Sequence, residues 1–249
     1  MWYSECNKAR ERMRMKKAIL FDLYDTVLKD ISFSVQQCFE WLYENYFKEV
    51  CTWEEFEAYR EAFTPIYTKR AENNSEVHFM RDEIVKIFEH FGVECPDDLE
   101  ELEYALMNQM QQETLLKAVK DTLIELHDKV IGMYMLSNSI FSGKATERLL
   151  GDFNILKYFN RVFVSADYGI RKPHPGFFQL AVEEIQKDYP DIQKEDILFV
   201  GNDYTSDVQG AIDAELEVVW YNVAEQAEEK GISTYSIRDF KELLNIISL

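Results

Sequence analysis

Short apolar runs alternate with helical stretches over most of this chain, and this alternation restricts the fold more than any other feature of the sequence. Helices repeat apolar residues at every third or fourth position, whereas the runs between them are almost continuously apolar. Strands that alternate with helices form a parallel sheet with helices on both faces. The pattern therefore predicts an α/β fold. The predicted strands cover residues 18–21, 131–136, 161–164, 197–200, 218–220 and a short segment near Tyr235.

A helical block separates the first predicted strand from the others. Residues 32–118 follow a helical period throughout and are rich in aromatic side chains, and no run within them predicts a strand. The simplest arrangement is a Rossmann-like, doubly wound parallel sheet with an all-helical cap domain inserted after its first strand. We expect residues 1–30 and 118–249 to form the core and residues 31–117 to form the cap.

The charge and the absence of targeting signals limit the partners. A formal net charge of −19 argues against nucleic acid and anionic membranes, which bind clusters of Lys and Arg. A small anionic substrate is compatible with this charge, because it needs only a local cation. The sequence shows neither a membrane-spanning run nor a secretory signal, and its cysteines form no C-x-x-C pair. We expect a cytoplasmic monomer or homodimer.

Four polar clusters follow the apolar runs, and three of them come directly after predicted strands. In an open α/β sheet, ligands bind beyond the carboxyl ends of the strands, where the following loops meet. We therefore expect the clusters to converge at one edge of the sheet. They cover residues 22–26, 137–139, 169–178 and 201–207.

The residue types in these clusters predict a covalent mechanism on an anionic substrate. Asp22 can attack such a substrate only if the surrounding negative charge is neutralised. Lys172 can pair with both the carboxylate and the substrate oxygens, and Ser137 can donate a hydrogen bond to a transferring oxygen. A divalent cation held by Asp22 and the acidic loop 201–207 would supply the remaining positive charge.

In this order, the clusters resemble the haloacid dehalogenase-like superfamily, which contains mostly phosphatases. The resemblance extends from Lys17 to the C-terminus and includes a helical cap between the first two clusters. It implies that Asp22 is the nucleophile, that Ser137 is the hydroxyl of the second motif, and that Lys172 is the lysine of the third. It further implies a small phosphorylated metabolite as the substrate.

The resemblance also implies a Mg²⁺ site. Its candidate ligands are Asp22, Tyr24 through its carbonyl, Asn202, Asp203 and Asp207. Phosphatases of this type carry an aspartate at the position of Asn202. Asparagine offers an oxygen but no charge, so we expect weaker Mg²⁺ binding unless Asp203 or Asp207 compensates. A metal-free state stays open.

Tyr24 departs from the phosphatase pattern. Family phosphatases carry a general-acid aspartate two residues after the nucleophile, and a phenol with a pKa near 10 is a poor substitute. Tyrosine at this position, together with Ser137 and Asn138, is similar to the 2-haloacid dehalogenases, whose halide leaving group needs no proton. That likeness implies catalytic and substrate-binding roles for Ser137, Asn138 and Lys172. Phe178 departs from the dehalogenase pattern.

Three functions therefore stay open. The first is a Mg²⁺-dependent phosphatase, the second a metal-independent hydrolase of the 2-haloacid dehalogenase type, and the third a binding or regulatory protein that keeps the fold without efficient chemistry. In the cap, Arg60, Lys69 and Arg70 are cationic candidates for contacting the substrate, and the sequence does not choose among them.

Overall fold

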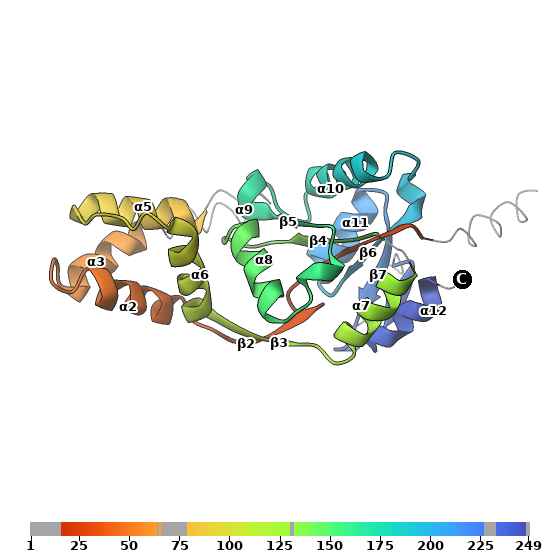
Figure 1. The fold of residues 1–249 in the computed structure, drawn as a ribbon, viewed down its shortest axis with the longest axis horizontal. Coiled ribbons are helices and arrows are strands. Elements are labelled where there is room, and N and C mark those ends of the chain that lie inside the picture. Colours follow the sequence, from red (N-terminus) through yellow and green to blue (C-terminus); the bar gives the residue numbers. More distant parts are fainter. Residues whose placement is uncertain (1–15, 64, 66–78, 130–131, 227–232, 248–249) are drawn as a thin grey trace, which may run out of the picture.

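The core of the molecule is a sheet of six parallel strands in the order β5-β4-β1-β6-β7-β8. Figure 1 shows this sheet and the helices around it in a computed structural model. The structure describes residues 16–63, 65, 79–129, 132–226 and 233–247. The predicted α/β fold is confirmed. The strands are β1 (Ala18–Phe21), β4 (Gly132–Ser137), β5 (Arg161–Val164), β6 (Ile197–Gly201), β7 (Glu217–Tyr221) and β8 (Tyr235–Ile237).

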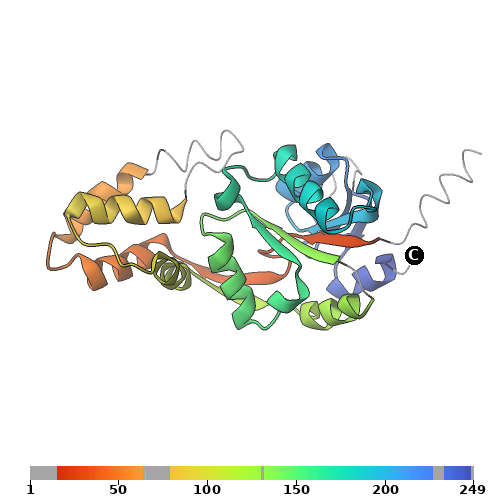
Figure 2. The same cartoon turned by 45° about the horizontal axis from the view of Figure 1, so that its top comes forward.

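Helices cover both faces of this sheet (Figure 2). Successive side chains of a strand point to opposite faces, so Ile19 and Phe21 enter one apolar cluster while Ala18 and Leu20 enter the other. The first face is covered by α7 (Val119–Asp128), α8 (Gly143–Asp152) and α12 (Leu243–Ile247), and the second by α10 (Pro175–Asp188) and α11 (Gly210–Asp213). Strand β1 is therefore buried on both faces at the centre of the sheet.

A group of helices stands beside the core, and we call it the cap. Its interior is aromatic: the Phe47 ring lies 4.9 Å from that of Phe88 and 5.2 Å from that of Phe56, measured between centroids. Apolar residues recur at helical spacing over residues 84–91, and these residues lie in a helix. The helix ends at Gly92, which has the left-handed conformation that glycine favours. The cap helices are α2 (Val35–Tyr46), α3 (Trp53–Arg60), α5 (Met80–Phe91) and α6 (Leu99–Met110).

The remaining helical segments are short. The region after β6 first forms a π-helical turn, η4 (Tyr204–Gln209), which continues directly into α11. None of the described helices is long and apolar enough to cross a bilayer. The other short segments are α9 (Ser165–Tyr168), η1 (Glu61–Phe63), η2 (Leu156–Tyr158), η3 (Lys194–Asp196) and η5 (Phe240–Glu242).

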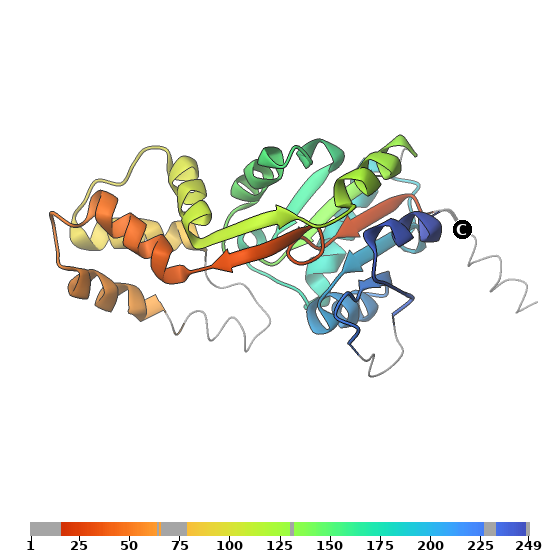
Figure 3. The ribbon, with the colours of Figure 1, turned by 90° about the horizontal axis from the view of Figure 1, so that it is seen from below.

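A two-stranded ribbon joins the core to the cap (Figure 3). Strands β2 (Leu28–Phe33) and β3 (Gln111–Leu115) pair antiparallel. The expectation that residues 32–118 contain no strand is therefore wrong. Its failure has a physical reason: Leu28 is the only buried residue of β2, and the sequence QQETL of β3 is mostly polar. Neither strand shows the apolar alternation that predicts one.

A buried carboxylate connects the cap to the core beside the sheet. Glu103 of α6 is fully buried and accepts hydrogen bonds from the main-chain nitrogen and the hydroxyl of Ser142, at 2.8 and 2.7 Å. Arg81 of α5 donates to the same carboxylate at 2.7 Å. Ser142 is the residue that caps the N-terminus of α8. One side chain thus ties two cap helices to the start of a core helix.

Replacing Glu103 by alanine is expected to destabilise the protein by about 3 kcal/mol, because it leaves the Arg81 cation and two Ser142 donors without their partner. This loss lies at the lower end of the range for buried ion pairs, because the Arg81 side chain is 26% exposed. Urea unfolding would measure the change. The matched control is Glu101→Ala, whose partner Arg148 is solvent-exposed, and it should leave the midpoint nearly unchanged. Equal effects of the two variants would contradict the assignment.

Candidate active site

A tight turn directly after β1 shapes the surroundings of Asp22. The main-chain nitrogen of Val27 donates to the carbonyl of Leu23 at 2.8 Å, and Asp25 has a positive φ of 56°. Aspartate is one of the few side chains that adopt this left-handed conformation readily. The turn brings the Thr26 hydroxyl back to Asp22, where it donates to Oδ2 at 2.8 Å. Thr26 is not among the site residues that the sequence predicts, and its spacing of four residues from Asp22 is the only sequence signal for this contact.

Lys172 lies between two buried carboxylates. Its Nζ is 2.6 Å from Oδ1 of Asp22 and 2.7 Å from Oδ1 of Asp207. The three side chains are buried, with residue exposures of 2% for Lys172, 6% for Asp22 and 1% for Asp207. The first, third and fourth sequence clusters therefore converge at the carboxyl edge of the sheet.

This cluster carries excess negative charge. Burial and the neighbouring Asp22 raise the pKa of Asp207 above its ordinary value, although Lys172 opposes the shift. Burial alone would lower the pKa of Lys172, but the carboxylates of Asp207 and Asp22 outweigh it and raise that pKa. The lysine therefore stays protonated, and one ammonium faces two carboxylates. A further cation or a protonated carboxyl group would complete the charge balance.

The loop after β6 is folded around Asp207. Its Oδ2 accepts from the main-chain nitrogens of Asn202 and Asp203, both at 3.0 Å. A Cβ at Gly201 would lie 2.6 Å from the Asp207 side chain, so only glycine permits this approach. The Gly201 position is thus needed for the carboxylate that pairs with Lys172.

The two other acidic-loop candidates face different directions. Oδ1 of Asn202 lies 3.2 Å from the Thr26 hydroxyl, next to Asp22. Asp203 is exposed, and its Oδ1 accepts from the nitrogen and hydroxyl of Ser206 at 2.6 and 2.8 Å, which caps the helical turn η4. The Asn202 side chain therefore lies beside Asp22 and Thr26, whereas the Asp203 side chain is exposed and bonds to Ser206.

Ser137 and Asn138 stand at the end of β4, the strand beside β1. The Ser137 hydroxyl is buried and has no hydrogen-bond partner within the described part of the chain. Such a group costs about 1–3 kcal/mol unless a ligand or water satisfies it. Asn138 instead forms two hydrogen bonds with the main chain of Lys172. The two neighbours therefore differ: one side chain is committed to the protein and the other is not.

Tyr24 points toward the ribbon. Its hydroxyl accepts a hydrogen bond from Nε2 of Gln111, the first residue of β3, at 2.8 Å. Burial raises the pKa of Tyr24 above its ordinary value of about 10, although the bond from Gln111 opposes the shift. The phenol is therefore an even poorer proton donor than the sequence suggests.

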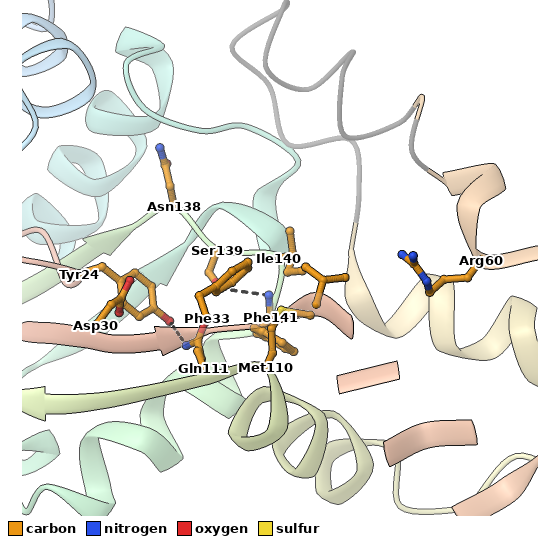
Figure 4. Close-up of a pocket in the computed structure, with 11 residues that line it drawn as sticks. Tyr24, Asp30, Phe33, Arg60, Met110, Gln111, Asn138, Ser139, Ile140 and Phe141 are labelled. Atoms are coloured by element: carbon orange, nitrogen blue, oxygen red, sulfur yellow. Dashed lines mark hydrogen bonds between the residues drawn. The ribbon is translucent and has the colours of Figure 1, made fainter. Parts of the chain in front are cut away.

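A cavity of about 440 Å³ lies between the core and the cap, next to Tyr24 and Asn138 (Figure 4). Its walls are mainly apolar or aromatic, as in most small-molecule sites. Arg60 lines it from the cap, whereas the other cationic candidates, Lys69 and Arg70, lie outside the described residues. Its remaining lining residues are Asp30, Phe33, Val35, Met110, Gln111, Ser139, Ile140 and Phe141.

The side-chain donor atoms gathered at this edge are oxygens, the type that Mg²⁺ prefers. No group of three or more His, Cys, Asp or Glu side chains suited to a metal occurs within the described ranges. The oxygen donors that lie together here are the carboxylates of Asp22 and Asp207, which flank Lys172, and the amide of Asn202, which lies beside Thr26. Mg²⁺ in enzymes binds one or two carboxylates and takes its other ligands from water and substrate phosphates. The residues present therefore suit this ion.

Comparison with known proteins agrees with the motif order. A family described as haloacid dehalogenase-like hydrolase matches residues 16–215. The chain is 26% identical to the pyrimidine 5'-nucleotidase PynA of Streptococcus pneumoniae over 199 residues, which cover 78% of this chain and 81% of PynA. It is also 26% identical to the HAD-hydrolase YfnB of Bacillus subtilis over 175 residues, which cover 68% and 71% of the two chains.

Solved structures share the fold. The crystal structure of YfnB bound to magnesium superposes with a TM-score of 0.58 at 20% identity and covers 95% of this chain and all of YfnB (100%). A 2-haloacid dehalogenase from Pseudomonas syringae superposes with a TM-score of 0.67 at 19% identity, over 94% of this chain and 99% of that one. At these identities the likeness supports the architecture, including the helical cap.

Proposed function

Because the chain belongs to the haloacid dehalogenase-like hydrolases, we propose that it is a Mg²⁺-dependent phosphatase of a small phosphorylated metabolite. The observation that carries the proposal is the excess negative charge at the buried site, where Asp22 and Asp207 share one lysine. Such a site favours a bound divalent cation, which in turn favours an anionic phosphate ester as the substrate. The similar PynA is named for a nucleotide substrate, which supports a phosphate ester.

In the proposed reaction, a carboxylate oxygen of Asp22 attacks the phosphorus of the ester. The bond from phosphorus to the leaving oxygen breaks, and its electron pair stays on that oxygen. Water then attacks the phosphorus of the aspartyl phosphate, which releases inorganic phosphate and restores the carboxylate. Lys172 would neutralise the attacking and transferring oxygens, and the unpartnered Ser137 hydroxyl would donate to one of the latter.

The ion itself would be held by Asp22, Asp207, the amide oxygen of Asn202 and the carbonyl of Tyr24. Bound there, Mg²⁺ would supply the positive charge that two carboxylates and a phosphate require. Asp203 is left out of this proposed set, because its side chain is exposed and caps the following helical turn, whereas the carboxylate of Asp207 is buried against Lys172. The cavity beside Tyr24 would receive the leaving group.

The test is phosphate release from a panel of small phosphate esters, measured with Mg²⁺ and with excess EDTA. We expect release that requires Mg²⁺ and that is fastest for esters with labile leaving groups. Equal rates in EDTA would overturn the metal requirement, and no release from any ester would overturn the phosphatase assignment.

Replacing Asn202 by aspartate is expected to strengthen Mg²⁺ binding, because it adds a negative charge beside Asp22 and Thr26. We expect the half-saturating Mg²⁺ concentration to fall by about tenfold, which corresponds to about 1.4 kcal/mol. A Mg²⁺ titration of turnover measures it. Asn45→Asp adds the same charge on the exposed face of α2 and should leave the titration unchanged. An unchanged midpoint for Asn202→Asp would place the ion elsewhere.

Replacing Tyr24 by aspartate is expected to speed the hydrolysis of esters with poor leaving groups more than that of esters with good ones. A carboxyl group can protonate a leaving alkoxide, an effect typically worth about 10²–10⁴-fold, whereas the half-buried phenol with its raised pKa cannot. The measurement is the ratio of kcat/KM for an alkyl phosphate to kcat/KM for an aryl phosphate, which should rise by at least about tenfold. Tyr24→Phe is the control and should leave this ratio unchanged. A lower ratio in Tyr24→Phe would identify the phenol as the acid after all.

The alternative reaction, halide displacement from a 2-haloacid, is favoured by Tyr24, which supplies no proton. It would form an alkyl ester of Asp22, and water would then attack the carbonyl carbon of that ester. A single turnover in ¹⁸O-labelled water would consequently place ¹⁸O in the Asp22 side chain, whereas water attack on phosphorus would not. Halide release from 2-chloropropionate together with this label would replace the phosphatase proposal.

A further inference from the structure

The Asn138 side chain is bonded to the backbone of the residue that places the ammonium group. Its Nδ2 donates to the carbonyl oxygen of Lys172 at 3.0 Å, and its Oδ1 accepts from the nitrogen of Lys172 at 2.9 Å. These bonds span 34 positions of sequence. The amide therefore satisfies both main-chain groups of one residue, as a neighbouring strand would. No main-chain group in the described ranges pairs with either of them.

Lys172 needs such a support because it lies in a loop between α9 and α10 rather than in a regular element. Its long side chain has to end within hydrogen-bond distance of both Asp22 and Asp207, at 2.6 and 2.7 Å. Ordering a lysine side chain costs up to about 2 kcal/mol of conformational entropy. A fixed backbone at its root limits the positions that the ammonium group can reach.

The segment that carries Asn138 is itself fixed on two sides. In the core, the nitrogen of Ser139 donates to the Ser165 hydroxyl, and that hydroxyl donates to the Ser139 carbonyl, both at 3.0 Å. On the cap side, the carbonyl of Ile140 accepts from the nitrogen of Met80 at 2.9 Å. Asn138 is therefore a rigid support and not a mobile loop residue.

We propose that Asn138 is a positioning residue that acts through Lys172 and not on the substrate. Its likeness to the Ser-Asn pair of dehalogenases implies a contact with substrate, but here the amide is engaged with the lysine backbone. The effect on turnover rests on the proposed function of Lys172. The effect of Asn138 on the position of the lysine side chain does not depend on that proposed function.

The first experiment measures the lysine directly. Wild type, Asn138→Ala and Asn138→Asp are treated with an amine-reactive reagent, and modification of Lys172 is followed by peptide mass spectrometry. We expect Asn138→Ala to raise the modification rate of Lys172 by about tenfold, because its ammonium is buried in the wild type. Asn138→Asp keeps the acceptor for the Lys172 nitrogen and should show a smaller increase. Ser137→Ala is the neighbouring control and should leave Lys172 protected. Thermal melts identify any variant that unfolds, in which case the aspartate variant decides.

The second experiment is a double-mutant cycle with Lys172→Met, assayed on a reactive aryl phosphate. We expect Asn138→Ala alone to lower kcat by about 10–100-fold, as a small misplacement of a catalytic group can do. In the Lys172→Met background the same replacement should have almost no effect. Equal losses in both backgrounds, or unchanged modification of Lys172, would overturn the proposal and support direct substrate contact. Raised modification in a protein that hydrolyses no phosphate ester would instead retain the positioning role and reject the phosphatase assignment.

Discussion

Replacing Asp22 by asparagine is expected to lower turnover by at least about 10⁴-fold, the largest effect we anticipate from any single substitution. Asparagine has nearly the same shape and can still accept from Thr26, so the turn after β1 should persist. The amide is not a nucleophile, however, so the proposed covalent intermediate cannot form. Lys172 retains its second partner, Asp207, in this variant. Steady-state phosphate release measures the loss.

The control for this experiment is available three residues further on. Asp25 is exposed and has a positive φ of 56°, a conformation that asparagine also adopts readily. Asp25→Asn makes the same chemical change outside the buried site, and we expect it to keep activity within about threefold. If Asp22→Asn kept comparable activity, the aspartyl mechanism would be wrong.

Replacing Lys172 by methionine is expected to damage both activity and stability. Methionine fills a similar volume, but Asp22 and Asp207 would then lie buried together without a cation. Removing one partner of a buried ion pair typically costs about 3–5 kcal/mol of stability. Phosphoryl transfer should fall by about 10²–10³-fold, because a charged donor to the transferring oxygens is lost. Urea unfolding and steady-state kinetics measure the two losses separately.

The stability loss in Lys172→Met should depend on pH. Burial and Asp22 already raise the pKa of Asp207, and removal of the lysine raises it further. A carboxyl group with a folded pKa above its unfolded value is protonated more strongly in the folded state, so stability falls as pH rises through that interval. The destabilisation should therefore be larger near about pH 8 than near about pH 5. A loss that grows toward acid pH would contradict this assignment. Lys144→Met, on the exposed side of α8, should show no such dependence.

The parts of the fold that sequence predicts well are those with strong apolar patterns. Residues 161–164 form a strand with the predicted bounds, and the strand predicted over residues 197–200 extends by one residue to Gly201. The ribbon could not be predicted because Leu28–Phe33 is mostly exposed and Gln111–Leu115 is mostly polar, so neither segment shows an alternation of apolar and polar residues. Two polar segments that pair across such a distance along the chain show no pattern in their own sequences that predicts the pairing.

The candidate site divides in the same way. Asp22 directly follows β1, Ser137 ends β4, and Asp207 lies in the turn η4 after β6. All three strands are fully buried, so the approximate placement of these side chains can be predicted from the apolar pattern. Two contacts cannot be predicted in this way, because they join residues that are far apart in the sequence. Asn138 and Lys172 are 34 positions apart, and Tyr24 and Gln111 are 87 positions apart. Such pairs are determined by how the loops and the ribbon pack, not by any local preference.

The ribbon makes the cap a replaceable module. Leu28 and Leu115 are register partners, so the chain leaves the core and returns to it at neighbouring points. A change of sequence between these two positions does not move the points at which the chain leaves and re-enters the core. Evolution can therefore vary the cap, and with it the lining of the cavity, as long as bonds to the core such as those of Glu103 and Gln111 are kept.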